Sequence, residues 1–250
     1  MDESIYEFIR ASPHTLKVVG QRQGVVAARR AGVAASSGDV LVFIDDDIRI
    51  PDANFLVNHA RNYADDEVMA VCGQELSPPD YQPGAGSGGE FATPFEQAVF
   101  FHRASTERRV VAHLATCNCS LRRDAWEKVG GLDPAFAGNS YGDDYDLALR
   151  MHSAGMNIVF DPSASMQHTR APMGGLRLDD PQNDYKEWEK YVSLWLFHLR
   201  HVPPKWRPWN FRQGILRKSL LLKRNALRPW RWPSVIWGLL RARAVAKRVV

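Results

Sequence analysis

The sequence predicts an α/β protein with a mainly parallel sheet, because helical and strand patterns alternate along it. A helical pattern over residues 24–36 leads directly into the apolar run Val40–Ile44, which is typical of a buried strand. A second helical pattern over residues 143–154 is stopped by Gly155, and an apolar run over residues 157–160 follows it. Sheets of this class bind their ligands at the carboxyl ends of their strands.

Shorter patterns predict the remaining elements. Residues 16–19 indicate an earlier strand and residues 68–72 a later one. Asp124, with Glu127 three residues on, predicts the capped start of a short helix that the glycine pair at 130–131 closes.

Residues 77–94 form the one long irregular stretch, with four Pro and four Gly in eighteen residues. A connection of that length in a compact domain is usually either functional or disordered. A mobile lid and a disordered insertion both remain open, and the insertion is favoured because the glycine-rich part offers no chemistry beyond flexibility.

Three consecutive acids, Asp45, Asp46 and Asp47, follow the strand Val40–Ile44 directly. Neighbouring carboxylates raise one another's pKa unless a positive charge lies between them, so three at a buried strand end favour a Mg²⁺ or Mn²⁺ site. Alternate residues of a strand face the same side, so Asp45 and Asp47 would share a ligand while Asp46 points elsewhere. A solvated acidic turn explains the tripeptide equally well.

A second acidic cluster, Asp143, Asp144 and Asp146, lies in the first turn of a predicted helix. The helix dipole favours negative charge there, and capping explains one of the three acids. A carboxylate that holds no metal is suited to accept a proton from an attacking hydroxyl. The two clusters together suggest transfer of a group from a phosphate ester to an alcohol.

In this order and spacing the residues resemble the inverting glycosyltransferases of family 2, which have a GT-A fold. The resemblance covers about residues 20–170 and extends to a late histidine, His168, after the strand at 157–160. It implies a three-layer GT-A-like catalytic domain over residues 1–185. The segments that carry it are residues 24–32, 38–47, 118–133 and 142–150.

The resemblance implies an inverting, metal-dependent transfer from a nucleoside diphosphate sugar. By position, Asp47 would bind Mg²⁺ or Mn²⁺ and the donor diphosphate. Asp45 would face the donor's ribose or sugar, and Asp46 would be a second donor contact or a solvated spacer. Asp144 would be the general base that takes the proton of the acceptor hydroxyl, with Asp143 beside it binding the acceptor.

Three further residues have both a functional and a structural interpretation. His168 is either a metal ligand, better suited to Mn²⁺ than to Mg²⁺, or a satisfied structural histidine. Arg29 either lies near the donor phosphates or is a helical surface residue, and the family usually has Asn where this chain has Arg30. Asn118 either binds acceptor hydroxyls or serves the backbone with a buried amide.

The family's first two strands, which normally hold the nucleotide base, have no counterpart before residue 16. Residues 1–9 instead look like the helix that follows the second strand. We therefore expect a domain that is incomplete at its N-terminus and binds the donor poorly. A misplaced start codon, a decayed gene and a protein completed by another chain all remain open.

Residues 191–250 hold fourteen of the 32 Lys and Arg residues, six of the eight Trp and no Asp or Glu. Residues 186–250 thus predict a basic, Trp-rich helical extension on an acidic body. Trp and basic residues suit an anionic membrane surface. A nucleic-acid tail is disfavoured, since no binding module accompanies it. A helical flap packed on the catalytic domain is the structural alternative.

Cys72, Cys117 and Cys119 are odd in number and lack a partner pair or a nearby His for zinc, which favours reduced thiols in the cytoplasm. No signal peptide and no apolar run of about 20 residues is seen. We expect an enzyme peripheral to the inner face of the cell membrane, acting on a carbohydrate or lipid-linked acceptor. The alternative is a non-catalytic, truncated relative that serves as a membrane-associated binding or scaffold subunit.

Overall fold

The computed structural model describes residues 24–79, 81–84, 90–136, 140–170, 187–217, 221, 230 and 232–246. The predicted strand over residues 16–19 and much of the irregular stretch after residue 84 lie outside these ranges. Among the helices of the described ranges, none is both long and apolar enough to cross a membrane.

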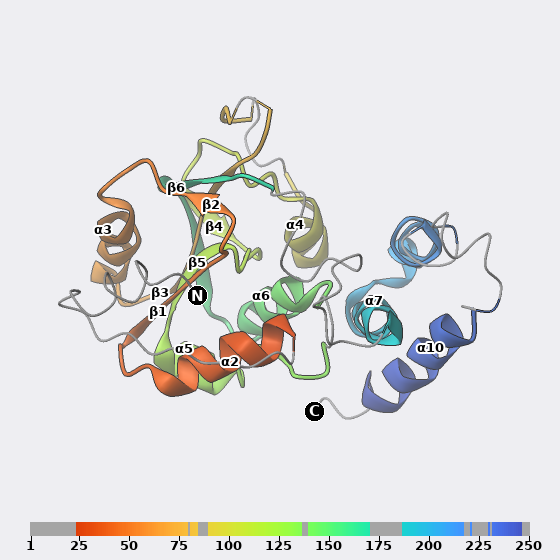
Figure 1. Ribbon diagram of the computed structural model, residues 1–250. Helices are drawn as coiled ribbons and strands as arrows, with labels where there is room; N and C mark the ends of the chain where they lie inside the picture. Colours follow the sequence, from red (N-terminus) through yellow and green to blue (C-terminus); the bar gives the residue numbers. More distant parts are fainter. Residues whose placement is uncertain are drawn as a thin grey trace, which may run out of the picture.

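A single six-stranded sheet forms the centre of the molecule (Figure 1). The strands run in the order β1, β5, β3, β6, β2, and β4 pairs with β6 outside this path. Their bounds are β1 Val40–Ile44, β2 Ile48–Arg49, β3 Val68–Leu76, β4 Arg109–Val111, β5 Asn118–Arg122 and β6 Asn157–His168.

The strand directions are mixed. β3 and β6 pair in parallel, whereas β5 is antiparallel to both of its neighbours, β1 and β3. The strands β1, β3 and β6 therefore point the same way, which is the expected parallel framework. The expectation was incomplete, because β2 and β4 also pair antiparallel with β6. The three co-directed strands bring their carboxyl ends to one edge.

Helices cover the sheet on both sides (Figure 1). α3 lies on one side, and α4 and α6 lie on the other. The bounds of the helices in the sheet region are α2 Val25–Ala35, α3 Phe55–Ala60, the 3₁₀ turn η1 Arg61–Ala64, α4 Pro94–Phe100, α5 Arg123–Lys128 and α6 Asp143–Ser153. This three-layer arrangement buries the apolar faces of the strands on both sides.

Three local predictions differ from the structure. The strand expected over residues 68–72 continues to Leu76. The strand expected over residues 157–160 continues to His168. Its pairing with β3 shifts register between Asp161 and Ser165, which allows the strand to bend there and continue. The helix expected at Asp124 exists, but its N-cap is Arg122 and no side chain caps it. Asp124 instead accepts a hydrogen bond from the adjacent Ala125 N–H at 2.7 Å.

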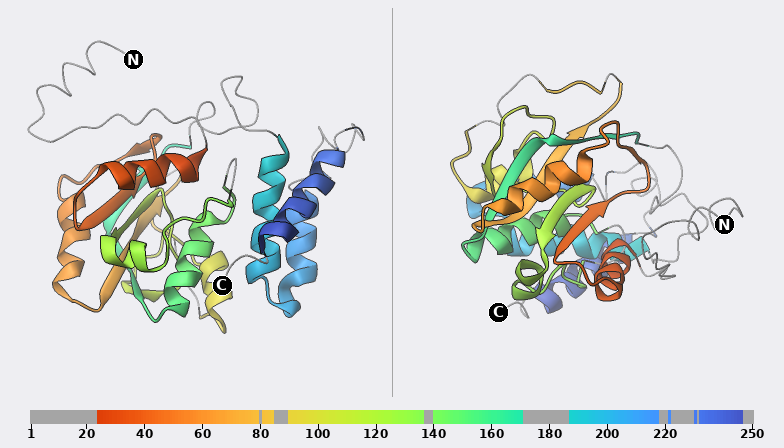
Figure 2. Two further views of the ribbon diagram at one scale, coloured as in Figure 1. Left: turned by 90° about the horizontal axis from the view of Figure 1, so that it is seen from below. Right: turned by 90° about the vertical axis from the view of Figure 1, so that its left-hand side faces the viewer.

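The C-terminal part is helical and lies beside α4 and α6 (Figure 2). Phe197 of its first helix packs against Phe95 and Tyr145, and Trp206 donates a hydrogen bond to Glu96 Oε1 at 2.8 Å. The main apolar core continues into this part. Its elements are α7 Glu187–His201, η2 Pro204–Trp206, α8 Arg207–Asn210, η3 Phe211–Leu216 and α10 Trp232–Ala246.

Candidate active site

The acids that follow β1 lie where two strands meet. β1 ends at Ile44, and β2 then pairs with the end of β6, which sets Ile48 opposite His168. Thr169 donates its backbone N–H to the Asp47 carbonyl at 2.9 Å and so fixes this turn. His168 Nε2 lies 3.6 Å from Asp45 Oδ2 and 3.6 Å from Asp47 Oδ1. The two alternate acids thus face one ring nitrogen.

The donor set at this turn fits a divalent cation. Separations of 3.6 Å are too long for hydrogen bonds, while ligands about 2.1 Å from one ion lie about 3 Å apart. Cys117 Sγ and ligand atoms of Asp45 and His168 lie within 4.8 Å of one another, but burial raises the pKa of this thiol well above its usual value, and a protonated thiol is a poor ligand. Asp46 is exposed, as a solvated spacer would be.

The second ring nitrogen of His168, Nδ1, constrains cation binding by Nε2. Arg170 donates its backbone N–H to His168 Nδ1 at 3.2 Å, which favours the tautomer with its proton on Nε2. A cation on Nε2 needs the opposite tautomer, with Nδ1 as a donor. Metal binding through His168 therefore requires the Arg170 contact to break.

Arg29 connects the two acidic clusters. It projects from α2, and its Nη2 donates to Asp45 Oδ1 at 2.7 Å. Its Nη1 lies 3.7 Å from Asp143 Oδ2, at the start of α6. The side chain is 17% exposed, so the charge acts in a partly dehydrated setting. The structure thus brings Asp45 and Asp143 together across residues that are far apart in sequence.

Asp143 is buried and Asp144 half-buried at the start of α6, and both hold their protons more tightly than usual. Burial, followed by the negative charge of Asp144, raises the pKa of Asp143 well above its ordinary value. Burial also raises the pKa of Asp144, while the positive charges of Arg103 and Arg29 lower it. Within the described part of the chain, Asp143 Oδ2 accepts no hydrogen bond. A carboxyl pair with raised pKa values and one unsatisfied oxygen is suited to proton transfer.

Gly142 places these acids. It precedes α6 with a φ of 87°, a left-handed conformation that glycine adopts without strain. A Cβ at this position would lie 3.0 Å from the Phe197 ring of α7. The glycine therefore allows α7 to pack closely against the turn that presents Asp143 and Asp144.

The third acid of this cluster, Asp146, is structural. It binds Arg150 Nε at 2.8 Å on its own helix and His201 Nε2 at 2.6 Å on α7. Burial opposes ionisation, but the hydrogen bond from His201 and the charge of Arg150 outweigh it and lower the pKa of Asp146. These contacts fasten α6 to α7.

Asn118 does not reach the site. It is fully buried in β5, and its Nδ2 donates to the Gln74 and Ala164 carbonyls at 2.9 Å each. Its Oδ1 lies 3.0 Å from His59 Nε2. These contacts favour the structural alternative for Asn118, because both amide hydrogens bind backbone carbonyls of neighbouring strands.

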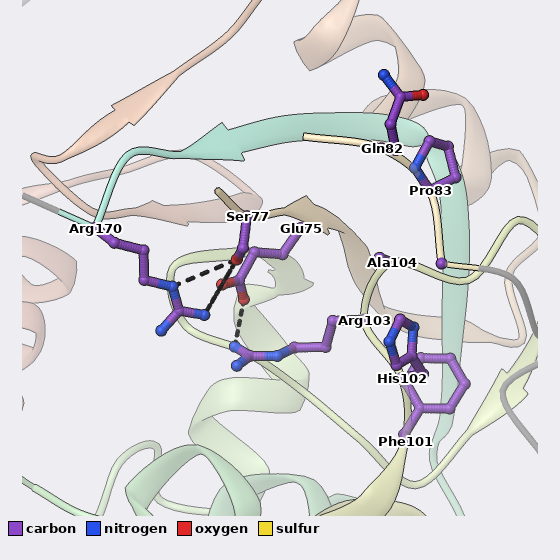
Figure 3. Close-up of a pocket in the computed structure, with 10 residues that line it drawn as sticks. Glu75, Ser77, Gln82, Pro83, Phe101, His102, Arg103, Ala104 and Arg170 are labelled. Atoms are coloured by element: carbon purple, nitrogen blue, oxygen red, sulfur yellow. Dashed lines mark hydrogen bonds and ion pairs between the residues drawn. The ribbon is translucent and has the colours of Figure 1, made fainter. Parts of the chain in front are cut away.

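One polar cluster beside the site had no counterpart in the sequence predictions. Glu75, near the end of β3, has a side chain only 2% exposed and pairs with Arg103 at 2.5 Å and Arg170 at 2.6 Å (Figure 3). Cys117 Sγ donates to Glu75 Oε2 at 3.5 Å, which links this cluster to the candidate cation site. A polar residue at the carboxyl end of a strand was the available signal, but β3 was expected to end at residue 72.

The chain matches glycosyl transferase family group 2 over residues 40–242. Protein y4gI of Sinorhizobium fredii, which is uncharacterized, is 24% identical over 209 residues, or 80% of this chain and 22% of that protein. The N-acetylglucosaminyl-diphospho-decaprenol L-rhamnosyltransferase of Mycobacterium tuberculosis is 30% identical over 138 residues, or 54% of this chain and 43% of that protein. The chain thus spans less than half the length of these curated relatives.

Among solved structures, GalNAc-T7 with UDP, GalNAc and Mn²⁺ is similar to this chain. Its TM-score is 0.60 at 16% sequence identity, and the match covers 93% of this chain and 46% of that chain. A likeness at this identity concerns the fold, and it confirms the predicted α/β, GT-A-like class.

Proposed function

The chain belongs to glycosyl transferase family group 2, and on that premise we propose that it transfers a sugar from a nucleoside diphosphate sugar to an acceptor hydroxyl, with inversion. One observation carries the proposal. Arg29 joins the two acidic clusters, since it donates to Asp45 at 2.7 Å and lies 3.7 Å from the buried Asp143.

In this proposal the cluster on α6 handles the acceptor and its proton, and the cluster after β1 handles the donor diphosphate. Asp144 takes the proton of the acceptor hydroxyl as its oxygen bonds to the anomeric carbon and the bond to the donor diphosphate breaks. Asp143, whose Oδ2 accepts no hydrogen bond within the described residues, binds the acceptor as a hydrogen-bond partner. Asp45, Asp47 and His168 would hold Mg²⁺ or Mn²⁺, which stabilises the charge of a departing diphosphate. Attack and departure on opposite faces invert the sugar.

The named relatives bear on the substrates. The Mycobacterium tuberculosis relative is a transferase named for a diphospho-decaprenol acceptor. The GalNAc-T7 structure holds UDP and Mn²⁺. We propose a nucleoside diphosphate donor and a carbohydrate or lipid-linked acceptor for this chain.

The mechanism is tested with Asp144→Asn and Asp47→Asn. Loss of the base should lower turnover by about 10²–10⁴-fold. Loss of Asp47 should weaken both Mn²⁺-dependent nucleotide binding and turnover. Asp66→Asn is the control, since Asp66 is a fully exposed acid outside the site. Turnover of nucleotide sugars in a folded Asp144→Asn protein at the wild-type rate would contradict the proposal.

The helical extension suits an anionic membrane at the inner face of the cell membrane, which is the second part of the proposal. One side of α10 packs inward through Val235, Gly238 and Ala242. The other side exposes Trp232, Ile236, Trp237 and Leu240, and its basic residues include Arg241 and Arg243. Aromatic and aliphatic side chains beside Arg are typical of helices that lie in a membrane interface.

Sedimentation with vesicles tests this membrane contact. The variant Ile236→Ser with Trp237→Ser should reduce binding to vesicles that contain phosphatidylglycerol by about tenfold or more, because two apolar side chains no longer enter the interface. Leu56→Ser is the control, since Leu56 is equally exposed on α3. Equal binding of both variants, or binding that ignores anionic lipid, would contradict it.

A further inference from the structure

A cavity of about 490 Å³ opens beside the candidate active site (Figure 3). Its walls come from the end of β3, from residues 82–84 and 101–104, and from Arg170 after β6. The volume is within the usual range for a small-molecule site. None of the residues predicted from sequence lines it, so it is a separate subsite.

Buried Glu75 orients two guanidinium groups at this cavity. Arg103 Nη1 lies 2.5 Å from Glu75 Oε2, and Arg170 Nη2 lies 2.6 Å from Glu75 Oε1. Ser77 accepts a hydrogen bond from Arg170 Nε at 3.3 Å. Figure 3 shows the two arginines on opposite sides of the carboxylate. A single carboxylate between two guanidinium groups leaves a net positive charge, held in a fixed geometry.

We propose that this cavity binds a phosphate or diphosphate group of the acceptor through Arg103 and Arg170. Each guanidinium group presents pairs of N–H donors in one plane. Such pairs match the spacing of two phosphate oxygens, which accept the hydrogen bonds. A neutral sugar would gain little from two charged donors, whereas a phosphate balances the excess charge.

The position of Arg103 indicates that the phosphate bound in this cavity belongs to the acceptor rather than to the donor. Within the described residues Arg103 pairs with Glu75 and not with Asp45, and it contacts the cation site only through the Cys117 thiol, at 3.8 Å. Its positive charge also acts on Asp144, the proposed base. The donor diphosphate belongs at Asp45 and Asp47, so an anion at Arg103 approaches from the side of the base. This assignment rests on the proposed transferase function.

The test measures phosphate binding with and without the exposed arginine. Arg170→Gln should weaken binding of inorganic pyrophosphate in EDTA by roughly tenfold, because charged hydrogen bonds to phosphate are lost. Arg61→Gln is the matched control: its side chain is 54% exposed against 52% for Arg170, and it pairs with a buried acid, Asp161, in the same way. Arg103→Lys keeps the charge beside Glu75 and should weaken binding without unfolding.

Further arms separate the sources of the phosphate. A polyprenyl phosphate in detergent micelles that binds more tightly than pyrophosphate, with unphosphorylated polyprenol inactive, would indicate a lipid-linked acceptor. Preference for free sugar phosphates would indicate a soluble one. UDP and GDP binding with Mn²⁺ should be unchanged in Arg170→Gln.

Two results would overturn the inference. One is pyrophosphate binding that survives in Arg170→Gln or falls equally in Arg61→Gln. The other is loss of Mn²⁺-dependent nucleotide binding in Arg170→Gln, which would make the cavity part of the donor site. Wild-type protein that binds pyrophosphate in this cavity but binds no nucleotide would contradict the transferase proposal, and with it the assignment of the phosphate to an acceptor. The inference that the cavity binds phosphate would still stand.

Discussion

The acids that follow β1 differ from those that begin α6 in what surrounds them. Asp45 and Asp47 are partly exposed and face His168, so solvent or a cation can balance their charge beside Arg29, which donates to Asp45 at 2.7 Å. Asp143 is buried, and Arg29 at 3.7 Å compensates it only in part. One cluster is therefore suited to holding a cation, and the other to holding a proton.

The same contrast exists inside the second cluster. Asp146 has hydrogen bonds from Arg150 and His201, and its pKa is lowered, whereas burial raises the pKa of Asp143. The number of satisfied contacts, rather than the residue type, separates a structural acid from a reactive one. Three substitutions test this difference.

Asp146→Asn should have the largest effect on stability, because it leaves Arg150 without its buried counter-charge and weakens the hydrogen bond with His201. We expect the free energy of unfolding to fall by about 3 kcal/mol at pH 7. A carboxyl with a lowered pKa stabilises the fold above its unfolded pKa of about 4, so the difference from wild type should shrink as the pH falls below that value. Urea unfolding at several pH values measures it.

Asp124→Asn serves as the control for this substitution, since Asp124 is an exposed acid in the first turn of α5. Its unfolding free energy should change by less than about 0.5 kcal/mol. A similar loss of unfolding free energy in both variants would mean that the contacts of Asp146 do not stabilise the fold more than those of an exposed acid.

Arg29→Met should have an intermediate effect on stability, about 2 kcal/mol, and a distinct effect on activity. Removing this charge raises the pKa of Asp143 and of Asp144 further. The acid limb of the kcat/KM profile should therefore move to higher pH. Arg30→Met is the control on the same helix, because within the described residues Arg30 binds the carbonyls of Gly130 and Leu132 and no acid. An unmoved limb would show that Arg29 does not act on the base.

Asp143→Asn should have the smallest effect on stability and the opposite sign. A carboxyl whose pKa is raised on folding destabilises the fold once the pH exceeds its unfolded pKa of about 4. The amide removes that cost, so we expect a gain of about 1 kcal/mol at neutral pH and none near pH 4. Thermal unfolding against pH measures it, and a loss of stability at pH 8 would contradict it.

Local patterns predicted several elements closely. The helix expected over residues 24–36 is α2, Val25–Ala35, and the one expected over 143–154 is α6, Asp143–Ser153. Both have helical spacing and a glycine close to the end, which are short-range signals. β6 was underpredicted, because its later half carries polar residues whose partners lie on α3 and β3, such as Ser165 with Gln74 at 2.8 Å.

Sites that depend on distant partners were harder to predict. Asn118 has the same side chain whether it binds a sugar or joins β3 to β6, and only the positions of Gln74 and Ala164 distinguish the two. Arg103 and Arg170 meet at Glu75 from segments that no local pattern connects.

Short-range chemistry in the chain was thus enough to place an acid triplet at a strand end, a second acidic group at a helix start and a basic extension. Tertiary structure alone decided which of these acids are satisfied, that Arg29 joins the two clusters, and that Glu75 fixes two arginines beside them. The physical reason is that a charge's effect depends on burial and on partners within a few ångströms, and those partners come from strands and helices far apart in sequence.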